Sequence, residues 1–314
     1  MFNVDSRHRV CASATQKGRT VRKRSSLKTI VIGTALMVAC AVSQTATAAS
    51  PQDPAQSAPP IEQSSQAPPP SDRAVDPSEP DFTLIGLPTT LRMPKFASAF
   101  RVTHRFTRSL GQGNFGDLVA DGFGTDGGAQ IGLEYRFGIL SGTQLGVHRT
   151  SDKTIQFFGQ HQLVRQREGV PLGIDVIATV EGLDNFQEVY SPAVGAVVST
   201  RLGTHGALYA EPIWIGNTNS FDLVEGEDND TFILGLGGRF RIRPRLYIVA
   251  EAAPRFGYDP GIAYASFGFE IRAGGHSFQI NVSDGFGTTM AQLARGGFDS
   301  EDWYLGFNIS RKFF

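Results

Sequence analysis

The feature that most constrains this chain is an alternation of apolar and polar residues that runs from about residue 96 to its end at residue 314. Residues 129–137 show it best, with Ala, Ile, Leu, Tyr and Phe at the odd positions and Gln, Gly, Glu and Arg at the even ones. A period of two places successive side chains on opposite faces of a β-strand. No stretch of this region has the pattern of a long amphipathic helix, so the alternation predicts an all-β fold.

Turn residues divide this region into twelve alternating segments. Each is close to the roughly 9–11 residues that a tilted strand needs to cross a bilayer. We therefore predict a transmembrane antiparallel up-and-down β-barrel of about 12 strands. The predicted strands are 97–107, 128–137, 143–149, 154–165, 171–182, 191–202, 207–216, 231–242, 246–254, 262–272, 277–284 and 302–313.

The lengths of the connections support this prediction independently. Every even-numbered connection has five residues or fewer, whereas all odd-numbered ones except 150–153 have seven or more. A soluble β-sandwich gives no reason for such alternation. An outer-membrane barrel does, because its periplasmic turns are short and its external loops are longer. An even strand count also places both ends of the barrel in the periplasm.

The first 48 residues have the pattern of a secretory signal peptide. Basic residues at 22–24 and 28 precede an apolar run over 30–42, and Ala46-Thr47-Ala48 supplies small residues for cleavage. The apolar run is too short to span a bilayer comfortably. The alternative is a lipoprotein with Cys40 acylated, although Met37 makes a poor lipobox.

Residues 49–80 are predicted to be a disordered periplasmic linker, and residues 81–314 the barrel. Nine of the 17 prolines of the chain lie in the linker, together with Ser, Gln and Ala. Such a segment buries too little apolar surface to offset its ordering entropy.

Charge and cysteine content exclude several classes of function. Residues 49–314 contain 21 Lys and Arg against 29 Asp and Glu, a formal net charge of −8, and only three of the basic residues are Lys. Nucleic-acid binding requires a concentrated basic surface, which is missing. Both cysteines, Cys11 and Cys40, precede the cleavage site, so no thiol chemistry and no haem attachment site are expected in the exported protein. No cofactor is predicted.

The C-terminal strand ends in two aromatic residues, Phe313 and Phe314. A terminal aromatic after an alternating strand resembles the signal that the barrel assembly machinery reads in outer-membrane proteins. Only Phe313 shares the apolar face of the strand, so either a bulge places Phe314 there or recognition uses Phe313. The expected partners are this machinery, the lipid bilayer and lipopolysaccharide.

Three short motifs resemble a bacterial family of predicted outer-membrane β-barrels of unknown function. They are Thr-His-Arg-Phe at 103–106, Ser-Asp-Lys-Thr at 151–154 and Gly-Phe-Asn-Ile-Ser-Arg at 306–311. The resemblance covers roughly residues 84–314. It implies a barrel fold and an outer-membrane location, and it brings no activity.

Function is expected on the polar face of the strands, because charged side chains facing lipid near the midplane would cost about 2–4 kcal/mol each for Arg. Six basic and six acidic residues are predicted to line the lumen: Arg101, Arg105, Glu134, Arg136, Asp175, Glu181, Glu211, Arg239, Arg241, Glu251, Glu270 and Arg272. They indicate either a passive channel for small polar solutes or a non-conducting scaffold whose interior is closed by Arg–carboxylate bridges. A soluble periplasmic barrel is a further alternative.

Other motifs favour structural roles. Gly111–Gly116 matches GxGxxG, but no long helix follows, so we predict an external loop. Residues 288–294 form a short helix candidate that either folds inward, reaches outward to a partner or belongs to an ordinary surface loop. An acidic loop offers a weak calcium candidate formed by Glu225, Glu227, Asp228 and Asp230.

The histidines show no metal-binding spacing, and a structural role is expected for His104, His148, His161, His205 and His276. Catalysis would require a nucleophile, a base and a group that orients the base. The pairs Ser151 with His148 and Ser277 with His276 are the only sequence neighbours that suggest a membrane hydrolase. Neither pair lies in a catalytic signature, and we predict that the protein is not an enzyme.

Overall fold

The computed structural model describes residues 75–167, 169–219, 229–258, 262–297 and 302–314, all within one compact unit, Ser64–Phe314. The predicted signal peptide (1–48), Cys40 and residues 49–74 of the predicted linker lie outside the described residues.

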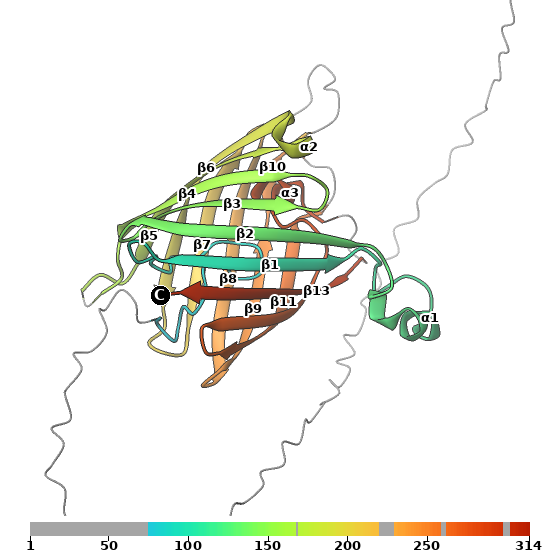
Figure 1. Cartoon of the computed structure of the whole chain (residues 1–314), viewed down its shortest axis with the longest axis horizontal. Helices are drawn as coiled ribbons and strands as arrows, with labels where there is room; N and C mark the ends of the chain where they lie inside the picture. Colours follow the sequence, from blue (N-terminus) through green and yellow to red (C-terminus); the bar gives the residue numbers. More distant parts are fainter. Residues whose placement is uncertain (1–74, 168, 220–228, 259–261, 298–301) are drawn as a thin grey trace, which may run out of the picture. The chain divides into compact units, whose positions relative to one another are not determined.

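The described residues form a closed barrel of twelve antiparallel strands (Figure 1). Each strand pairs with its neighbours in sequence, and β1 pairs with β13 to close the ring. The short strand β10 (Arg255–Gly257) follows Pro254 and extends the pairing of β9 with β8. The long strands are β1 (Ser98–Phe106), β2 (Ala129–Leu140), β3 (Thr143–Thr150), β4 (Ile155–Val164), β5 (Gly173–Gly182), β6 (Glu188–Arg201), β7 (Gly206–Ile215), β8 (Thr231–Arg243), β9 (Leu246–Ala253), β11 (Tyr264–Ala273), β12 (His276–Ser283) and β13 (Tyr304–Phe313).

The predicted up-and-down topology and strand count are confirmed, and the weakest predicted segment, 143–149, is the regular strand β3. We call the rim that carries the short connections and both ends of the wall, Ser98 and Phe313, the turn end. The opposite rim, with the longer connections, is the loop end. One turn-end connection is longer than predicted and covers residues 165–172, where an isolated bridge joins Arg167 to Val170.

The outer and inner faces of the wall alternate as predicted. On β2, Leu133 and Tyr135 are exposed on the outside, whereas Glu134 and Arg136 are buried inside. At the C-terminus, Phe313 lies on the outer face and Phe314 packs edge-on against Phe82 inside the turn end. Phe313 therefore joins the apolar face without a bulge.

The helices lie in the loop-end connections. They are α1 (Phe115–Ala120), the 3-10 turn η1 (Gly122–Gly124), α2 (Leu183–Phe186) and α3 (Met290–Arg295). Helix α1 begins inside the GxGxxG motif, where Asn114 and Asp117 form a capping box. It has only six residues and projects beyond the barrel rim (Figure 1). Among the described helices, none is long and apolar enough to span a membrane.

A segment outside the wall enters the barrel from the turn end. Residues 76–93, which we call the inner hairpin, run inward, reverse at Ile85–Gly86 and return to the start of β1. Pairing of Thr83 with Pro88 and a hydrogen bond from Leu84 N to Leu87 O (2.8 Å) define its tip. Ser78 and Glu79 are already buried, so the packed region begins before the predicted linker boundary at residue 80.

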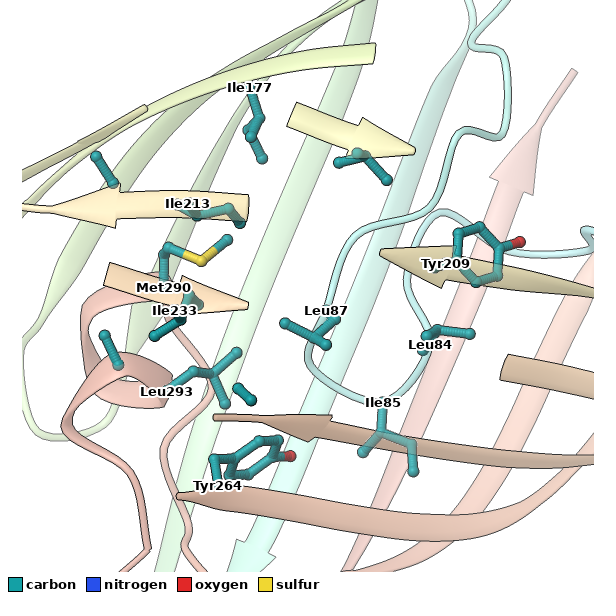
Figure 2. Close-up of a cluster of buried hydrophobic side chains, with 14 of the residues drawn as sticks. Leu84, Ile85, Leu87, Ile177, Tyr209, Ile213, Ile233, Tyr264, Met290 and Leu293 are labelled. Carbon is teal, nitrogen blue, oxygen red and sulfur yellow. The ribbon is translucent and has the colours of Figure 1, made fainter. Parts of the chain in front are cut away.

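Helix α3 folds inward from the loop end and meets the hairpin tip. Met290 and Leu293 join Leu84, Ile85 and Leu87 in one buried apolar cluster (Figure 2). The wall contributes inward-facing residues from β5 to β9 and from β11, namely Ile177, Ala193, Val197, Ala207, Tyr209, Ile213, Ile215, Ile233, Tyr247, Val249, Ala253 and Tyr264. The short helix predicted over 288–294 thus takes the inward alternative, and the interior is partly an apolar core.

Candidate functional site

Ten of the twelve predicted lumen residues are buried on the inner face of the wall. They are Arg101, Arg105, Glu134, Arg136, Asp175, Glu181, Glu211, Arg239, Glu251 and Glu270. The other two, Arg241 and Arg272, are half-buried near the turn end. The pairing of β8 with β9 shifts register directly after Arg241. The guanidinium of Arg241 donates to the hydroxyl oxygen of Thr204, in the adjoining turn, at 3.3 Å. The buried residues surround the inner hairpin, which the sequence did not predict.

Glu251 binds the tip of the hairpin through its main chain. Its carboxylate accepts hydrogen bonds from three consecutive amides, those of Ile85 (3.0 Å), Gly86 (2.6 Å) and Leu87 (3.1 Å). Tyr264 and Ser266 also donate to this carboxylate, at 3.2 and 3.0 Å. Hydrogen bonds to an ionised acceptor are stronger than neutral ones, so this carboxylate is the main anchor of the tip.

The carbonyl oxygens of the inward arm are bound by wall side chains. Arg239 donates to Thr83 O at 2.7 Å, and Gln279 donates to Leu84 O at 2.9 Å. Ile85 O accepts from two wall residues, at 3.2 Å from a guanidinium of β1 and at 3.0 Å from Asn308.

The return arm is bound in the same way, because Gln160 Nε2 donates to Thr89 O at 2.7 Å. The same amide nitrogen lies 2.8 Å from Asp175 Oδ2. The wall therefore satisfies the main chain of a segment that has no place in its ladder.

Ionic and polar contacts hold the inward arm at the turn end. Lys312 Nζ lies 3.2 Å from a carboxylate oxygen of Asp81, and Ser310 donates to the other oxygen. Farther out, Asp76 forms an ion pair with Arg201 at 2.7 Å.

Glu79 connects the two arms of the hairpin to the wall. Its carboxylate accepts from Thr90 N at 2.9 Å and from the Tyr209 hydroxyl at 3.0 Å. The hydroxyl of Thr90 in turn lies 2.5 Å from that of Ser199 on β6. Both arms are therefore fixed close to the turn-end mouth.

The wall also contains buried ion pairs between its own strands. Glu134 of β2 pairs with Arg101 of β1 at 2.8 Å and with Arg136 two residues along its own strand, and Arg239 of β8 pairs with Glu270 of β11 at 2.8 Å. These are the Arg–carboxylate bridges expected of a closed interior. They occur together with the hairpin, since Arg101 and Arg239 bind both a carboxylate and the hairpin main chain.

Several buried side-chain nitrogen and oxygen atoms of the wall form no hydrogen bond within the described parts of the chain. Both carboxylate oxygens of Glu211 are buried without a hydrogen bond, as are Nε and Nη2 of Arg105 and Nε and Nη1 of Arg239. Leaving a buried polar group unsatisfied costs about 1–3 kcal/mol, and more when it is charged. A permanent protein core rarely retains such groups.

Small cavities remain between the hairpin and the wall. One of about 50 Å³ lies at the turn end among residues that include Asp76, Glu79, Thr90 and Arg201. Another, of about 10 Å³, lies beside Phe82. Because a cavity of this measure needs about 10–15 Å³ to hold one water, the first space has room for a few waters at most and the second is at the limit for one.

Helix α3 is fastened to the loop end of the wall. Met290 N donates to Gln156 Oε1 at 2.6 Å, and Gln292 Nε2 donates to Asp152 Oδ2 at 2.9 Å. Arg295 donates to Thr218 O at 2.9 Å and lies 3.4 Å from a carboxylate oxygen of Glu181.

The pKa values of two loop-end carboxyl groups are shifted in opposite directions. Burial acts to raise the pKa of Asp152, but hydrogen bonds from Thr150, Gln130 and Thr154 outweigh it and hold the pKa below its ordinary value. For Asp284, burial dominates and raises the pKa to about 6. Asp152 thus remains a charged acceptor for the amide of α3.

The serine and histidine neighbours make separate contacts. His148 is buried inside the barrel with Nδ1 3.9 Å from Glu134, while the Ser151 hydroxyl bonds to the main chain of Ala129 and Ile131. Ser277 is buried on the inner face of β12. Its neighbour His276 stacks with Phe278, which is exposed on the outer face. The side chains of Ser277 and His276 therefore lie on opposite sides of the wall.

Two of the remaining histidines, His104 and His161, contact a neighbouring side chain. His104 stacks on Phe307 with ring centroids 4.8 Å apart, and His161 Nδ1 lies 2.8 Å from the Thr143 hydroxyl. Among the residues with described placement, no group of three or more His, Cys, Asp or Glu could hold a metal ion.

The calcium candidate falls largely outside the described residues, which exclude Glu225, Glu227 and Asp228. Asp230 is described, and its carboxylate accepts from Asn217 N at 3.1 Å. A calcium site there stays a prediction.

Two sequence signals could have indicated the hairpin. The inner face of β8 carries Gly235 and Gly237, and a Cβ at either position would meet the hairpin side chains Leu87 or Leu84. The inner face of the neighbouring strand β7 carries Ile213, an apolar side chain that would be exposed to water in a water-filled lumen. Small and apolar residues on an inner face indicate that protein, and not water, lies against it.

The closed wall, its lipid-type outer face and its filled interior define a membrane β-barrel with an internal plug. Residues 81–313 match the family model described as "Membrane bound beta barrel domain (DUF5777)". The chain belongs to this family, and the matched region includes most of the inner hairpin.

Solved porins resemble the chain at low identity. The NanC porin shares 8% identity over 69% of this chain and 99% of that chain, with a TM-score of 0.45. Omp33 of Acinetobacter baumannii shares 8% over 70% and 99%, with a TM-score of 0.40. A mutant of the Rh. blastica porin shares 11% over 59% and 55%, with a TM-score of 0.31. No curated protein matches the chain.

Proposed function

We propose that this barrel is an outer-membrane channel for small polar solutes, and that the inner hairpin closes it in the conformation described here. The observation that carries the proposal is a set of buried polar atoms that form no hydrogen bond among the described residues: both carboxyl oxygens of Glu211 and two guanidinium nitrogens each of Arg105 and Arg239. In a permanently filled interior these groups would each be costly. In an open barrel water would satisfy them.

The hairpin is suited to be removable because it is not part of the wall. The strand ladder closes without it, from β1 through β13 to β8 and β9. Its two arms both leave at the turn end, where Asp76 and Met93 lie near wall residues Arg201 and Gly142. It can therefore leave through one mouth without breaking a strand pair.

The proposed orientation places the turn end in the periplasm. Outer-membrane barrels have short turns on that side, and the predicted export signal and linker precede the hairpin there. Phe313, on the outer face of the last strand, is the proposed recognition point for the assembly machinery. Contacts with lipopolysaccharide at the loop end belong to the same proposal.

A non-conducting scaffold is the second candidate function. The filled interior favours it, and so does the apolar surface at the loop end, where Phe115, Val119 and Phe123 are exposed around α1. Exposed apolar groups of this kind are typical of interaction surfaces. A scaffold would keep the hairpin in place at all times.

Planar-bilayer recordings distinguish the two candidates. The full chain is compared with a variant in which residues 82–92 are replaced by a short Gly-Ser connection. A channel predicts rare conductance steps for the full chain and persistent steps for the variant. Liposome swelling with small sugars and amino acids should show the same difference.

A heat-modifiability gel serves as the folding control, because folded barrels migrate differently before and after boiling in detergent. A variant that folds by this criterion and still stays silent would contradict the channel and favour the scaffold.

A further inference from the structure

The barrel holds the tip of its hairpin mainly through main-chain atoms, whereas Asp76, Glu79 and Asp81 contribute side-chain contacts nearer the turn end. Three amides, of residues 85–87, donate to Glu251, and four carbonyl oxygens, of residues 83–85 and 89, accept from wall side chains. Main-chain groups are common to all peptides, so these contacts specify a backbone conformation and not a particular sequence. Such an array is the chemistry of a peptide-binding site.

At the tip, the side-chain requirement falls on Gly86 and the residues that flank it. A Cβ on Gly86 would lie 3.0 Å from Leu293 Cδ1 and 3.2 Å from Glu251 Oε1, closer than side-chain contacts normally are. The flanking Leu84 and Leu87 are fully buried in the apolar cluster that includes Leu293 (Figure 2). The site therefore fits a tight turn with glycine at its tip and apolar residues on either side.

Only a short connection joins the hairpin to the wall. Lys95 and Phe96 are exposed on it, and the Phe96 side chain is 70% accessible. The hairpin is thus held by non-covalent contacts along its length and by this connection at one end. Cutting the connection would convert the hairpin from a part of the chain into a ligand.

We propose that the interior of this barrel is a binding site for a peptide turn of the form apolar–apolar–Gly–apolar. The chain fills the site with its own residues 84–87, and the site takes a peptide of the same class supplied in trans. This inference does not require that the barrel conduct. It concerns what the interior recognises.

The test uses the full chain with a specific protease site inserted between Lys95 and Phe96. After folding and cleavage, the nicked barrel is incubated with excess synthetic peptide of residues 75–93, labelled with a fluorophore at its N-terminus. The label lies at the turn-end mouth, away from the tip contacts. Binding is read by co-elution with the barrel and by fluorescence anisotropy.

Two variants test the recognition chemistry. A Gly86→Leu peptide should bind at least tenfold more weakly, because its side chain collides with Leu293 and Glu251. A Glu251→Gln barrel should bind the unaltered peptide at least tenfold more weakly, since three amides lose an ionised acceptor. Asp284→Asn is the control, a buried acid at the loop end that accepts from Ala265 N and has no hydrogen bond to the hairpin among the described residues, and should change the affinity less than twofold.

The expected result is exchange of the labelled peptide into the nicked barrel with this order of affinities. If the nicked barrel keeps its heat-modifiable fold but binds no peptide, the proposal is wrong. Equal binding of the Gly86→Leu peptide would also overturn it, and that comparison uses the unaltered wall, so it decides even if Glu251→Gln fails to fold. If the nicked barrel binds the peptide and the folded variant lacking residues 82–92 is silent in bilayers, the channel is refuted and this inference stands.

Discussion

The wall and the inner hairpin of this barrel are stabilised in different ways. In the wall, each strand pairs along most of its length with two neighbours, and lipid-facing apolar side chains alternate with inward polar ones. The hairpin has a short pairing of its own at Thr83 and Pro88 and is held mainly by wall side chains and by its packing against α3. One chain therefore contains both a regular shell and a separable segment that is held as a ligand would be.

The largest expected effect concerns the wall. Leu133 lies on the outer face near the middle of β2, at a register position paired with Val102 of β1. Leu133→Arg should lower the free energy of unfolding by about 2–4 kcal/mol, because a charge near the bilayer midplane is costly. Urea titration of the barrel in lipid vesicles measures it.

A matched control lies on the same strand. Leu140 is also exposed but ends β2 at the turn end, where an Arg costs only about 0–1 kcal/mol. Equal losses for Leu133→Arg and Leu140→Arg would contradict the placement of the wall in the membrane.

A smaller effect is expected for a variant that destabilises the hairpin and leaves the wall unchanged. Gly237→Val places a side chain against Leu84 from the inner face of β8. Overpacking costs about 1–3 kcal/mol, so hydrogen exchange of the amides of Leu84 and Leu87 should accelerate by about 5- to 150-fold if they exchange by local opening. Amides of the wall should keep their protection.

Gly159→Val is the control for this variant, since a Cβ at Gly159 meets Leu145, which lies on the outer face. It should leave exchange in the hairpin unchanged. If Gly237→Val instead released the wall and the hairpin together, the two regions would not be separable.

The smallest effect is expected at the turn-end mouth. Asp76→Asn removes the ion pair with Arg201, whose side chains are 35% and 25% exposed. Partly exposed pairs contribute up to about 1 kcal/mol, so exchange in the hairpin should accelerate less than about fivefold. Asp184→Asn breaks an exposed pair with Lys153 at the loop end and should not affect the hairpin.

The wall was predictable because its physics is periodic. Segment 129–137 shows the alternation directly, and the lengths of the connections fixed the topology. The inner hairpin was not predictable in this way, because residues 76–93 have no period and their contacts lie up to 231 residues away, as between Asp81 and Lys312.

The candidate site was predicted only in part. Residues such as Glu251 and Arg239 were expected to face a lumen, and they lie on the inner face of the wall. The hairpin that these residues bind was not predicted, since the sequence does not distinguish an acid that binds three main-chain amides from one that lines a water-filled pore. A glycine at position 237 indicates that protein packs against the wall there, but this can be inferred only when the residue is known to face the interior.

The central claim is that residues 76–93 lie inside the barrel, and a cysteine crosslink tests it most directly. Thr90 and Ser199 have hydroxyl oxygens 2.5 Å apart, so Thr90→Cys with Ser199→Cys should form a disulfide. Val198→Cys is the matched control, because adjacent residues of β6 point to opposite faces. Cys11 and Cys40, the two native cysteines, are replaced by serine.

The measurement is the fraction of crosslinked protein in intact membranes after mild oxidation. The structure predicts that most of the Thr90→Cys, Ser199→Cys protein crosslinks and that little of the Val198→Cys pair does. A folded barrel that crosslinks neither pair, or both equally, would contradict a hairpin inside the wall.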